Sequence, residues 1–252
     1  MIPLDDDNPT LRLPIVTILL LVAIAATWIF VQGAGLDYEV LASSVCHLGL
    51  VPGELTAKAA VGASVPIGEG MSCVVDNDPI KYLTPLTSMF LHGGWLHVIS
   101  NGVFLWVFGN NVEDSMGRVR FVVFYLLCGL TAAAVQVAVQ PASPVPMVGA
   151  SGAISGVMGA YLVLYPKARV KTLLFFIVFF RVVWLPAWFF LLYWFALQVL
   201  AAIPQLAQAQ ATVEGGVATM AHVGGFLTGA LLVKLFQNDR LLAQRAHGRS
   251  LL

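Results

Sequence analysis

Charged residues are scarce in this chain of 252 residues. Asp, Glu, Lys and Arg make up 10% of it, whereas a soluble globular domain carries roughly 25%. Long stretches contain no charge, and short connecting segments contain most of it. This segregation is typical of a polytopic membrane protein, and it excludes an ordinary soluble domain.

The chain also lacks an excess of positive or negative charge. The 13 Lys and Arg residues balance 13 Asp and Glu residues, so nothing indicates a nucleic acid or an acidic soluble partner. A signal peptide is not evident, because the first apolar run is long enough to span and residues 11–33 show no convincing cleavage site. We therefore expect this run to remain as a membrane span.

Six apolar segments match the length of about 20 residues that a spanning helix needs. A more polar loop, residues 33–82, separates the first two segments. Residues 172–202 are too long for one span, and Arg181 and Pro186 divide them, so residues 172–180 are predicted to form a short interfacial or re-entrant piece. The predicted spans are residues 13–31, 86–108, 121–139, 149–164, 186–202 and 217–235.

The expected fold is an all-α polytopic membrane protein with six transmembrane helices in a single domain, residues 1–252. In such an arrangement the basic residues of the short loops fall on one side, and Lys and Arg mark cytoplasmic loops. We therefore expect both termini in the cytoplasm and the loop 33–82 outside. The basic residues that set this orientation are Arg118, Arg120, Lys167, Arg169, Lys171, Arg181, Lys234, Arg240, Arg245 and Arg249.

Two of the three cysteines, Cys46 and Cys73, fall in the long outer loop. An outer loop faces an oxidising compartment, where disulfides form and persist. We predict a disulfide between them, with two free thiols as the alternative.

Strongly polar residues interrupt three of the predicted spans. Such residues are costly in a bilayer and by default indicate a functional site. His97 and Asn101 are four residues apart and share a helical face. With Ser151 and His222 they fall in the outer half of the membrane, where water from outside can reach them.

Small residues accompany this polar cluster. Glycines at helical spacing let membrane helices approach closely, so the fourth and sixth spans are expected to pack together and bring Ser151 toward His222. A serine within hydrogen-bond reach of a histidine is a nucleophile with its general base. Because no intramembrane Asp accompanies them, the sequence predicts a dyad. The glycines of these two spans are Gly152, Gly156, Gly159, Gly225 and Gly229.

The start of a helix also suits an oxyanion. Its free backbone N–H groups and the positive end of its dipole favour developing negative charge. The backbone N–H of Ser151 is therefore a candidate donor, and the side chains of His97 and Asn101 are two more.

At these residues the sequence resembles the rhomboid family of intramembrane serine proteases. The family's GxSG motif appears around Ser151, and its HxxxN motif runs from His97 to Asn101. The resemblance covers roughly residues 82–235, followed by a short cytoplasmic tail, residues 236–252. Further matching positions are His92 before the HxxxN motif, Gly149 and Gly152 around the serine, Gly225 and Gly229 after His222, and Glu113 in the segment after the second span.

The resemblance implies a membrane protease without a cofactor or metal. Its substrates would be single-span membrane proteins, cleaved within or beside their transmembrane helix. Because the site faces the outer side and the compact chain favours a bacterial host, we expect it in the bilayer of the bacterial inner membrane. Ser151 would be the nucleophile and His222 the general base. His97, Asn101 and the Ser151 backbone N–H would form the oxyanion hole, while His92 would have a structural or water-organising role and Glu113 would organise the cytoplasmic loop.

The resemblance also implies a gate and a cap. The fifth helix, residues 186–202, would be the gate, and Trp194 and Gln198 share one of its faces, although plain packing would explain that equally well. The segment before the sixth span, residues 205–216, would be the cap.

Two departures from the family pattern stand out. Some members carry an aromatic residue four positions after the nucleophile, stacked on the catalytic histidine, where this chain has Ser155. What orients His222 is therefore left open. The Trp-Arg pair that some relatives have in the first loop is also missing.

Three other readings compete with the protease. A transporter or channel would distribute ionisable residues through the membrane or show an internal repeat, and neither is evident. A zinc protease could use His92, His97 and His222 as ligands, but zincin-type sites place two histidines four apart with a glutamate between them. A catalytically silent relative that binds transmembrane clients differs from the protease only in activity.

Overall fold

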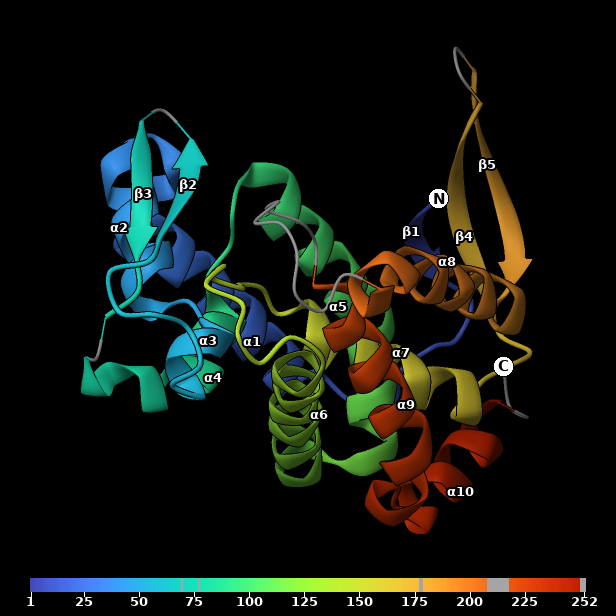
Figure 1. Ribbon diagram of the computed structural model, residues 1–252. Helices are drawn as coiled ribbons and strands as arrows, with labels where there is room; N and C mark the ends of the chain where they lie inside the picture. Colours follow the sequence, from blue (N-terminus) through green and yellow to red (C-terminus); the bar gives the residue numbers. More distant parts are fainter. Residues whose placement is uncertain (69, 77, 177–178, 208–217, 250–252) are drawn as a thin grey trace.

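The computed structural model describes residues 1–252 except 69, 77, 177–178, 208–217 and 250–252 (Figure 1). Its core is a bundle of helices around α7, whose middle residues are almost completely buried. The helices packed around α7 and their bounds are α5 (Trp95–Met116), α6 (Arg118–Val139), α7 itself (Ser151–Leu164), α8 (Ala187–Ala207) and α9 (Thr219–Phe236).

Apolar length distinguishes these helices from one another. Among the described residues, α6, α9 and Ala187–Pro204 of α8 are long and apolar enough to cross a membrane. The first helix, α1 (Ile15–Ala26), continues as a π-helical turn to Val31 and forms, like α7, a shorter apolar helix.

The second predicted span is displaced along the chain. We expected residues 86–108, but α5 runs from Trp95 to Met116. The residues before it form only short turns, α4 (Thr84–Thr87) and a 3₁₀ turn (Ser88–Phe90), because Gly94 has a non-helical backbone at the helix start. At the other end, the polar residues after 108 stay helical because they bond to neighbouring segments.

Helices α7 and α9 pack backbone against backbone. A Cβ atom at Gly225 would overlap the carbonyl oxygen of Gly152, and one at Gly229 would overlap the carbonyl oxygen of Gly156. Only glycine permits this approach, as is common at interfaces between membrane helices. The start of α7 and the first turn of α9 are thereby held side by side.

The segment between α1 and α4 contains several elements of its own. Asp37 caps α2 (Tyr38–Leu48) by accepting from two backbone N–H groups, and a disulfide joins Cys46 of α2 to Cys73. Its other elements are α3 (Pro52–Leu55), a hairpin of β2 (Ser64–Gly68) and β3 (Met71–Val74), and a 3₁₀ turn, Pro79–Tyr82.

A three-stranded antiparallel sheet corrects the all-α prediction. Strand β4 (Arg169–Phe176) pairs with β5 (Phe179–Pro186) on one side and with β1 (Ile2–Asp6) on the other. The segment 172–180 was predicted as an interfacial or re-entrant piece, but its described residues, 172–176 and 179–180, lie in the paired strands β4 and β5. Its β-branched and aromatic residues favour strands, and a short apolar run does not by itself distinguish a strand from a buried helix.

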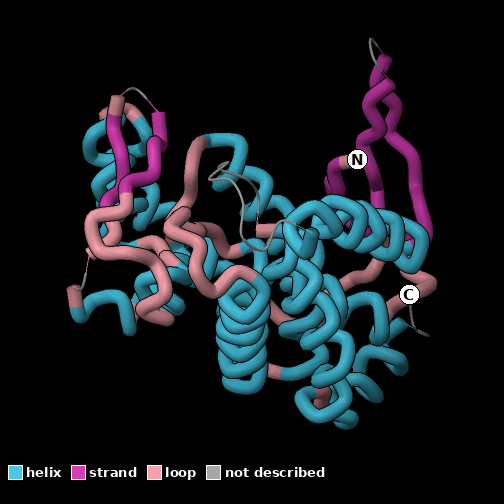
Figure 2. The backbone as a smooth tube through the Cα atoms, in the orientation of Figure 1, coloured by secondary structure: helices cyan, strands magenta, loops and turns pink. Residues whose placement is uncertain are grey.

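Polar contacts join both ends of the chain. Arg245, on α10 (Asp239–Arg249), is buried and donates to Asp114 at 2.8 Å and to Asn8 at 2.9 Å. Arg12 donates to the same Asp114 at 2.9 Å. The N-terminal segment and α10 therefore lie at one end of the bundle, where α5 finishes. Figure 2 shows that the two groups of strands are separate from each other, one on either side of the helices.

Candidate active site

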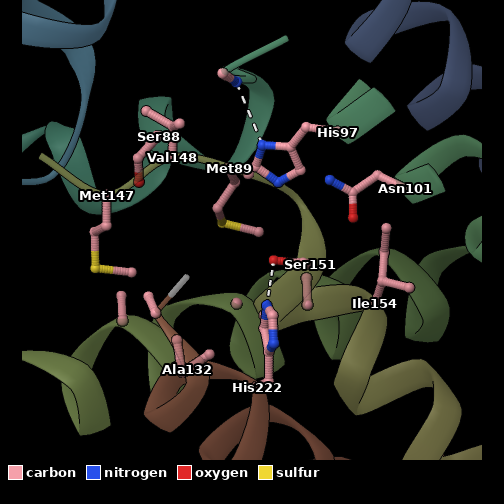
Figure 3. A pocket seen from close by; sticks show the side chains of 18 of the residues that line it. Ser88, Met89, His97, Asn101, Ala132, Met147, Val148, Ser151, Ile154 and His222 are labelled. Atoms are coloured by element: carbon pink, nitrogen blue, oxygen red, sulfur yellow. Dashed lines mark hydrogen bonds between the residues drawn. The ribbon is translucent and has the colours of Figure 1, made fainter. Parts of the chain in front are cut away.

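Ser151 and His222 are hydrogen-bonded to each other. Ser151 is the first residue of α7, and its Oγ lies 2.7 Å from Nε2 of His222 in the first turn of α9 (Figure 3). His222 is 8% exposed. The sequence predicted that these two side chains lie within hydrogen-bond reach of each other, and the glycine packing of α7 on α9 produces this contact.

The backbone before Ser151 turns sharply. Gly149 has φ +127°, a conformation that favours glycine, and its N–H donates to the carbonyl of Ser88 at 2.9 Å. A Cβ at this position would lie 2.7 Å from Nε2 of His97. Gly149 thus lets the chain enter α7 beside His97, and the first N–H groups of a helix have no partner inside it.

His97 and Asn101 face the serine from α5. The N–H of Gly93 donates to Nδ1 of His97 at 3.3 Å, so a neutral imidazole carries its proton on Nε2, the atom nearest to Gly149. Asn101 is 5% exposed, and its Nδ2 has no hydrogen-bond partner among the described residues. Figure 3 shows both side chains pointing toward the space above Ser151. The pair can supply two N–H donors to an oxyanion there.

His92 lies behind His97. It is fully buried, its ring contacts that of His97 edge-on at 5.0 Å, and its Nδ1 lies 3.3 Å from the carbonyl of Phe90. The side chain of Gln32 bonds to both the N–H and the carbonyl of His92. This placement fits a supporting role for His92.

Helix α8 contributes two side chains to the surroundings of His222. Oε1 of Gln198 lies 2.8 Å from Nδ1 of His222, and the Trp194 ring lies 5.9 Å from the imidazole. The hydroxyl of Ser155 donates to the carbonyl of Ser151 at 2.6 Å. The partner of His222 that the sequence left open is therefore on α8, and its only signal was the shared face of Trp194 and Gln198.

Glu113 has a different position from the one predicted. It lies inside α5, 3% exposed, and not in a loop after the second span. Its carboxylate accepts from the N–H groups of Val16 and Thr17 and from the hydroxyl of Thr17, at 2.8–3.0 Å. Glu113 thus caps the start of α1 and fastens it to α5.

A cavity of about 970 Å³ opens over the dyad. The cavity extends to Val65–Ile67 of β2. Its wall includes Ser151, His222, His97, Asn101, Met89, Ala132 and Trp194. Among the described residues, no group of three His, Cys, Asp or Glu side chains is placed to hold a metal ion. The zinc-site reading therefore lacks a ligand set in this part of the chain.

A family model described as the Rhomboid domain matches residues 80–238 of this sequence. The chain belongs to the rhomboid family. With its apolar helices, it is a multi-pass membrane protein of that family.

Several curated relatives share segments of this rhomboid chain. The Rhomboid protease GluP of Bacillus subtilis is 43% identical over 77 residues, which cover 31% of this chain and 15% of that protein. The Putative rhomboid protease YdcA of the same organism is 34% identical over 77 residues, covering 31% and 38%. RHOMBOID-like protein 5 of Arabidopsis thaliana is 34% identical over 77 residues, covering 31% and 25%. The match thus spans well under half the length of each of these relatives.

Proposed function

We propose that this rhomboid protein is an intramembrane serine endopeptidase that cleaves single-span membrane proteins within or beside their transmembrane helix. The observation that carries the proposal is the 2.7 Å contact between Ser151 Oγ and His222 Nε2. The same cavity holds Nδ2 of Asn101, which has no hydrogen-bond partner in the described part of the chain. Two of the relatives, GluP and YdcA, are named as rhomboid proteases, which supports the proposal.

The reaction is acyl transfer in two steps. Nε2 of His222 takes the Ser151 hydroxyl proton as Oγ attacks the scissile carbonyl, and the same nitrogen then protonates the leaving amine. Negative charge on the carbonyl oxygen is stabilised by the Ser151 backbone N–H, Nε2–H of His97 and Nδ2–H of Asn101. A water molecule, activated by His222, then hydrolyses the acyl-enzyme.

The substrate must unwind before it can react. Backbone amides of a transmembrane helix are already hydrogen-bonded, so an extended peptide has to be released from the helix first. Substrates with Gly, Ala or Ser near the outer end of their span are expected to be cleaved faster than substrates with a Leu-rich segment there.

The proposal includes a membrane arrangement. One rhomboid-type domain crosses the bacterial inner membrane six times, with both termini in the cytoplasm. The contacts of Arg245 with Asn8 and Asp114 support a common side for the two ends, as an even number of spans requires.

The test is cleavage in liposomes of a fluorescent single-span substrate with a small-residue juxtamembrane segment. Wild type should cleave it, and Ser151→Ala and His222→Ala should not. Ser43→Ala, an exposed serine of the outer loop, is the matched control and should cleave normally. Equal cleavage by wild type and Ser151→Ala would refute the assignment. If wild type neither cleaves nor reacts with a fluorophosphonate probe, the chain is a catalytically silent rhomboid.

A further inference from the structure

The position of Gln198 gives α8 a role in the chemistry. Its Oε1 can only accept a hydrogen bond, so the 2.8 Å contact requires the proton on Nδ1 of His222. Nε2 is then left with its lone pair directed at the Ser151 hydroxyl, 2.7 Å away. We propose that Gln198 is a positioning residue that holds His222 in the tautomer and rotamer of a general base, an inference that rests on the proposed function.

An amide orients a histidine differently from a carboxylate. It fixes the ring and its tautomer but places no full negative charge beside the imidazolium that forms during the reaction. Such a charge would be costly to bury in the membrane. Gln198 therefore explains how a base can be oriented in a site without an intramembrane Asp.

The residues beside Gln198 limit rotation of the imidazole. Trp194, one turn earlier on α8, lies against His222 at an interplanar angle of 36° and stacks on Phe226 of α9 at 30°. An aromatic ring and an acceptor thus reach the base together from the same helix.

Much of α8 is open to its surroundings. Phe189, Leu192, Tyr193, Leu197 and Leu200 are 42–61% exposed. The helix is therefore held mainly along the face that carries Trp194 and Gln198. If α8 moves away from α9, His222 loses its acceptor and the dyad loses its base, so the state of the site is coupled to the position of this helix.

The experiment compares Gln198→Met, which keeps the length of the side chain without the acceptor, with Gln198→Glu and the control Leu197→Met. The reaction of Ser151 with a fluorophosphonate probe reports nucleophile activation without a substrate, and proteolysis separates kcat from KM. Gln198→Met should lower the probe rate and kcat by about 10- to 100-fold, within the contribution of general base catalysis, with little change in KM or melting temperature. Leu197→Met should stay within about twofold of wild type.

Gln198→Glu distinguishes orientation from packing. A carboxylate keeps the acceptor and adds negative charge, so it should retain activity that Gln198→Met loses and move the acidic limb of the pH–rate profile to higher pH. Wild-type probe rate and kcat in Gln198→Met would overturn the positioning role while leaving the protease intact. A wild type inert to both substrate and probe would overturn the proposed function, and the positioning role with it.

A second inference comes from the tip of the β4–β5 hairpin. Phe175, Phe179 and Phe180 are 61%, 75% and 76% exposed. Phe175 pairs with Phe180, and side chains alternate along a strand, so Phe179 points to the opposite face. The described strand ends are thus apolar on both faces, and Figure 1 shows β4 and β5 extending away from the helices.

The base of the hairpin is fixed to the bundle. Val170 and Thr172 are fully buried, and β5 leads directly into α8. The hairpin therefore projects from the end of two membrane-embedded helices.

Its charges all have one sign. Residues 167–186 contain Lys167, Arg169, Lys171 and Arg181 and no acidic residue. Arg181 is exposed and follows the phenylalanines directly, and Trp184 is 46% exposed. Aromatic rings beside basic side chains are typical of segments in the membrane interface, where Lys and Arg attract anionic headgroups.

We infer that the described strand ends of this hairpin bind the bilayer surface, with the phenylalanines at the boundary of headgroups and acyl chains and Arg181 at lipid phosphates. A protein partner would cover one face of the hairpin, whereas lipid can surround both. This inference requires the membrane placement and does not depend on proteolysis.

The test uses a bimane label at Phe180→Cys, and at Val61→Cys in the outer loop as a control, in nanodiscs. Val61 is 63% exposed. Brominated phospholipid should quench most of the emission at position 180 and little at 61, and aqueous iodide should do the reverse. Iodide quenching at 180 as strong as at 61 would overturn the inference. Arg181→Gln should weaken the lipid quenching in phosphatidylglycerol nanodiscs but not in phosphatidylcholine, and an unchanged value would overturn the headgroup contact.

Discussion

The helix pair α7–α9 and the helix α8 meet at His222 but are held in different ways. Glycines bring α7 and α9 into backbone contact, where any side chain at Gly225 or Gly229 would overlap a carbonyl. Helix α8 contacts α9 through side chains such as Trp194 and Phe195, and much of it is exposed. A rigid contact thus sets the distance between Ser151 and His222, and a looser one sets the orientation of the His222 ring.

The largest effect is expected from breaking the rigid contact. Gly229→Val should destabilise the folded protein by about 2 kcal/mol or more, because its side chain has no room against the α7 backbone. Gly102→Ala is the matched control, since a Cβ there lies 3.8 Å from Leu21, an ordinary contact. Thermal unfolding in detergent measures both. A Gly229→Val protein as stable as Gly102→Ala would contradict the backbone packing.

Next in size is an effect on rate that leaves both helix contacts in place. In the proposed mechanism Asn101 donates to the developing oxyanion, so Asn101→Ala should lower kcat about 10²- to 10³-fold. KM and the melting temperature should change little. Asn110→Ala, at an intermediate position further along α5, should keep wild-type kcat. A loss of stability that parallels the loss of activity would indicate a structural role for Asn101 instead.

A smaller effect should follow from weakening the contact with α8. Trp194→Leu removes the ring beside His222 and should lower kcat by up to about tenfold, since an aromatic contact is worth about 1 kcal/mol. Trp188→Leu, on the same helix and 49% exposed, should have no such effect. Equal rates for the two variants would show that the orientation of His222 does not depend on this ring.

The smallest effect is expected at the end of the bundle where α5 finishes. There the titratable side chain of Asp6 contacts Asn111 of α5. Burial raises the pKa of Asp6 from 3.8 to about 6, and the hydrogen bonds from Tyr161, Asn8 and Asn111 offset this only in part. The folded state therefore binds this proton more tightly than the unfolded state, and the stability that it contributes is lost as pH rises through about 6. The melting temperature should fall slightly between pH 5 and pH 7 in wild type and less in Asp6→Asn. An identical slope would mean that Asp6 does not contribute.

Much of the site could be predicted because its residues have few alternatives in a membrane. A serine, two histidines and an asparagine are costly there, and their spacing, together with the glycines, placed them on facing helices. The partner of His222 could not be predicted, because a glutamine on an apolar helix has many uses and only the packing of α8 on α9 shows that Gln198 reaches Nδ1.

The fold outside the site was less predictable. The β4–β5 hairpin has the same apolar composition as a membrane segment, and its pairing with β1 joins residues more than 160 positions apart. The bounds of α5 depended on the Gly94 break and on partners for Glu113 and Asp114 that come from distant parts of the chain. The local sequence pattern shows neither the pairing of distant strands nor the hydrogen-bond partners that come from distant segments.

The shortness of α7 bears on the second half of the reaction. Its 14 residues extend over about 21 Å, whereas the hydrocarbon layer is about 30 Å thick. With its far end at one boundary, Ser151 lies about 9 Å below the other, at a depth where water is scarce. In the proposed mechanism, deacylation therefore depends on the cavity that reaches Val65–Ile67 of β2. Narrowing that entrance should let the acyl-enzyme accumulate, so turnover would be limited by the supply of water and not by attack on the peptide bond.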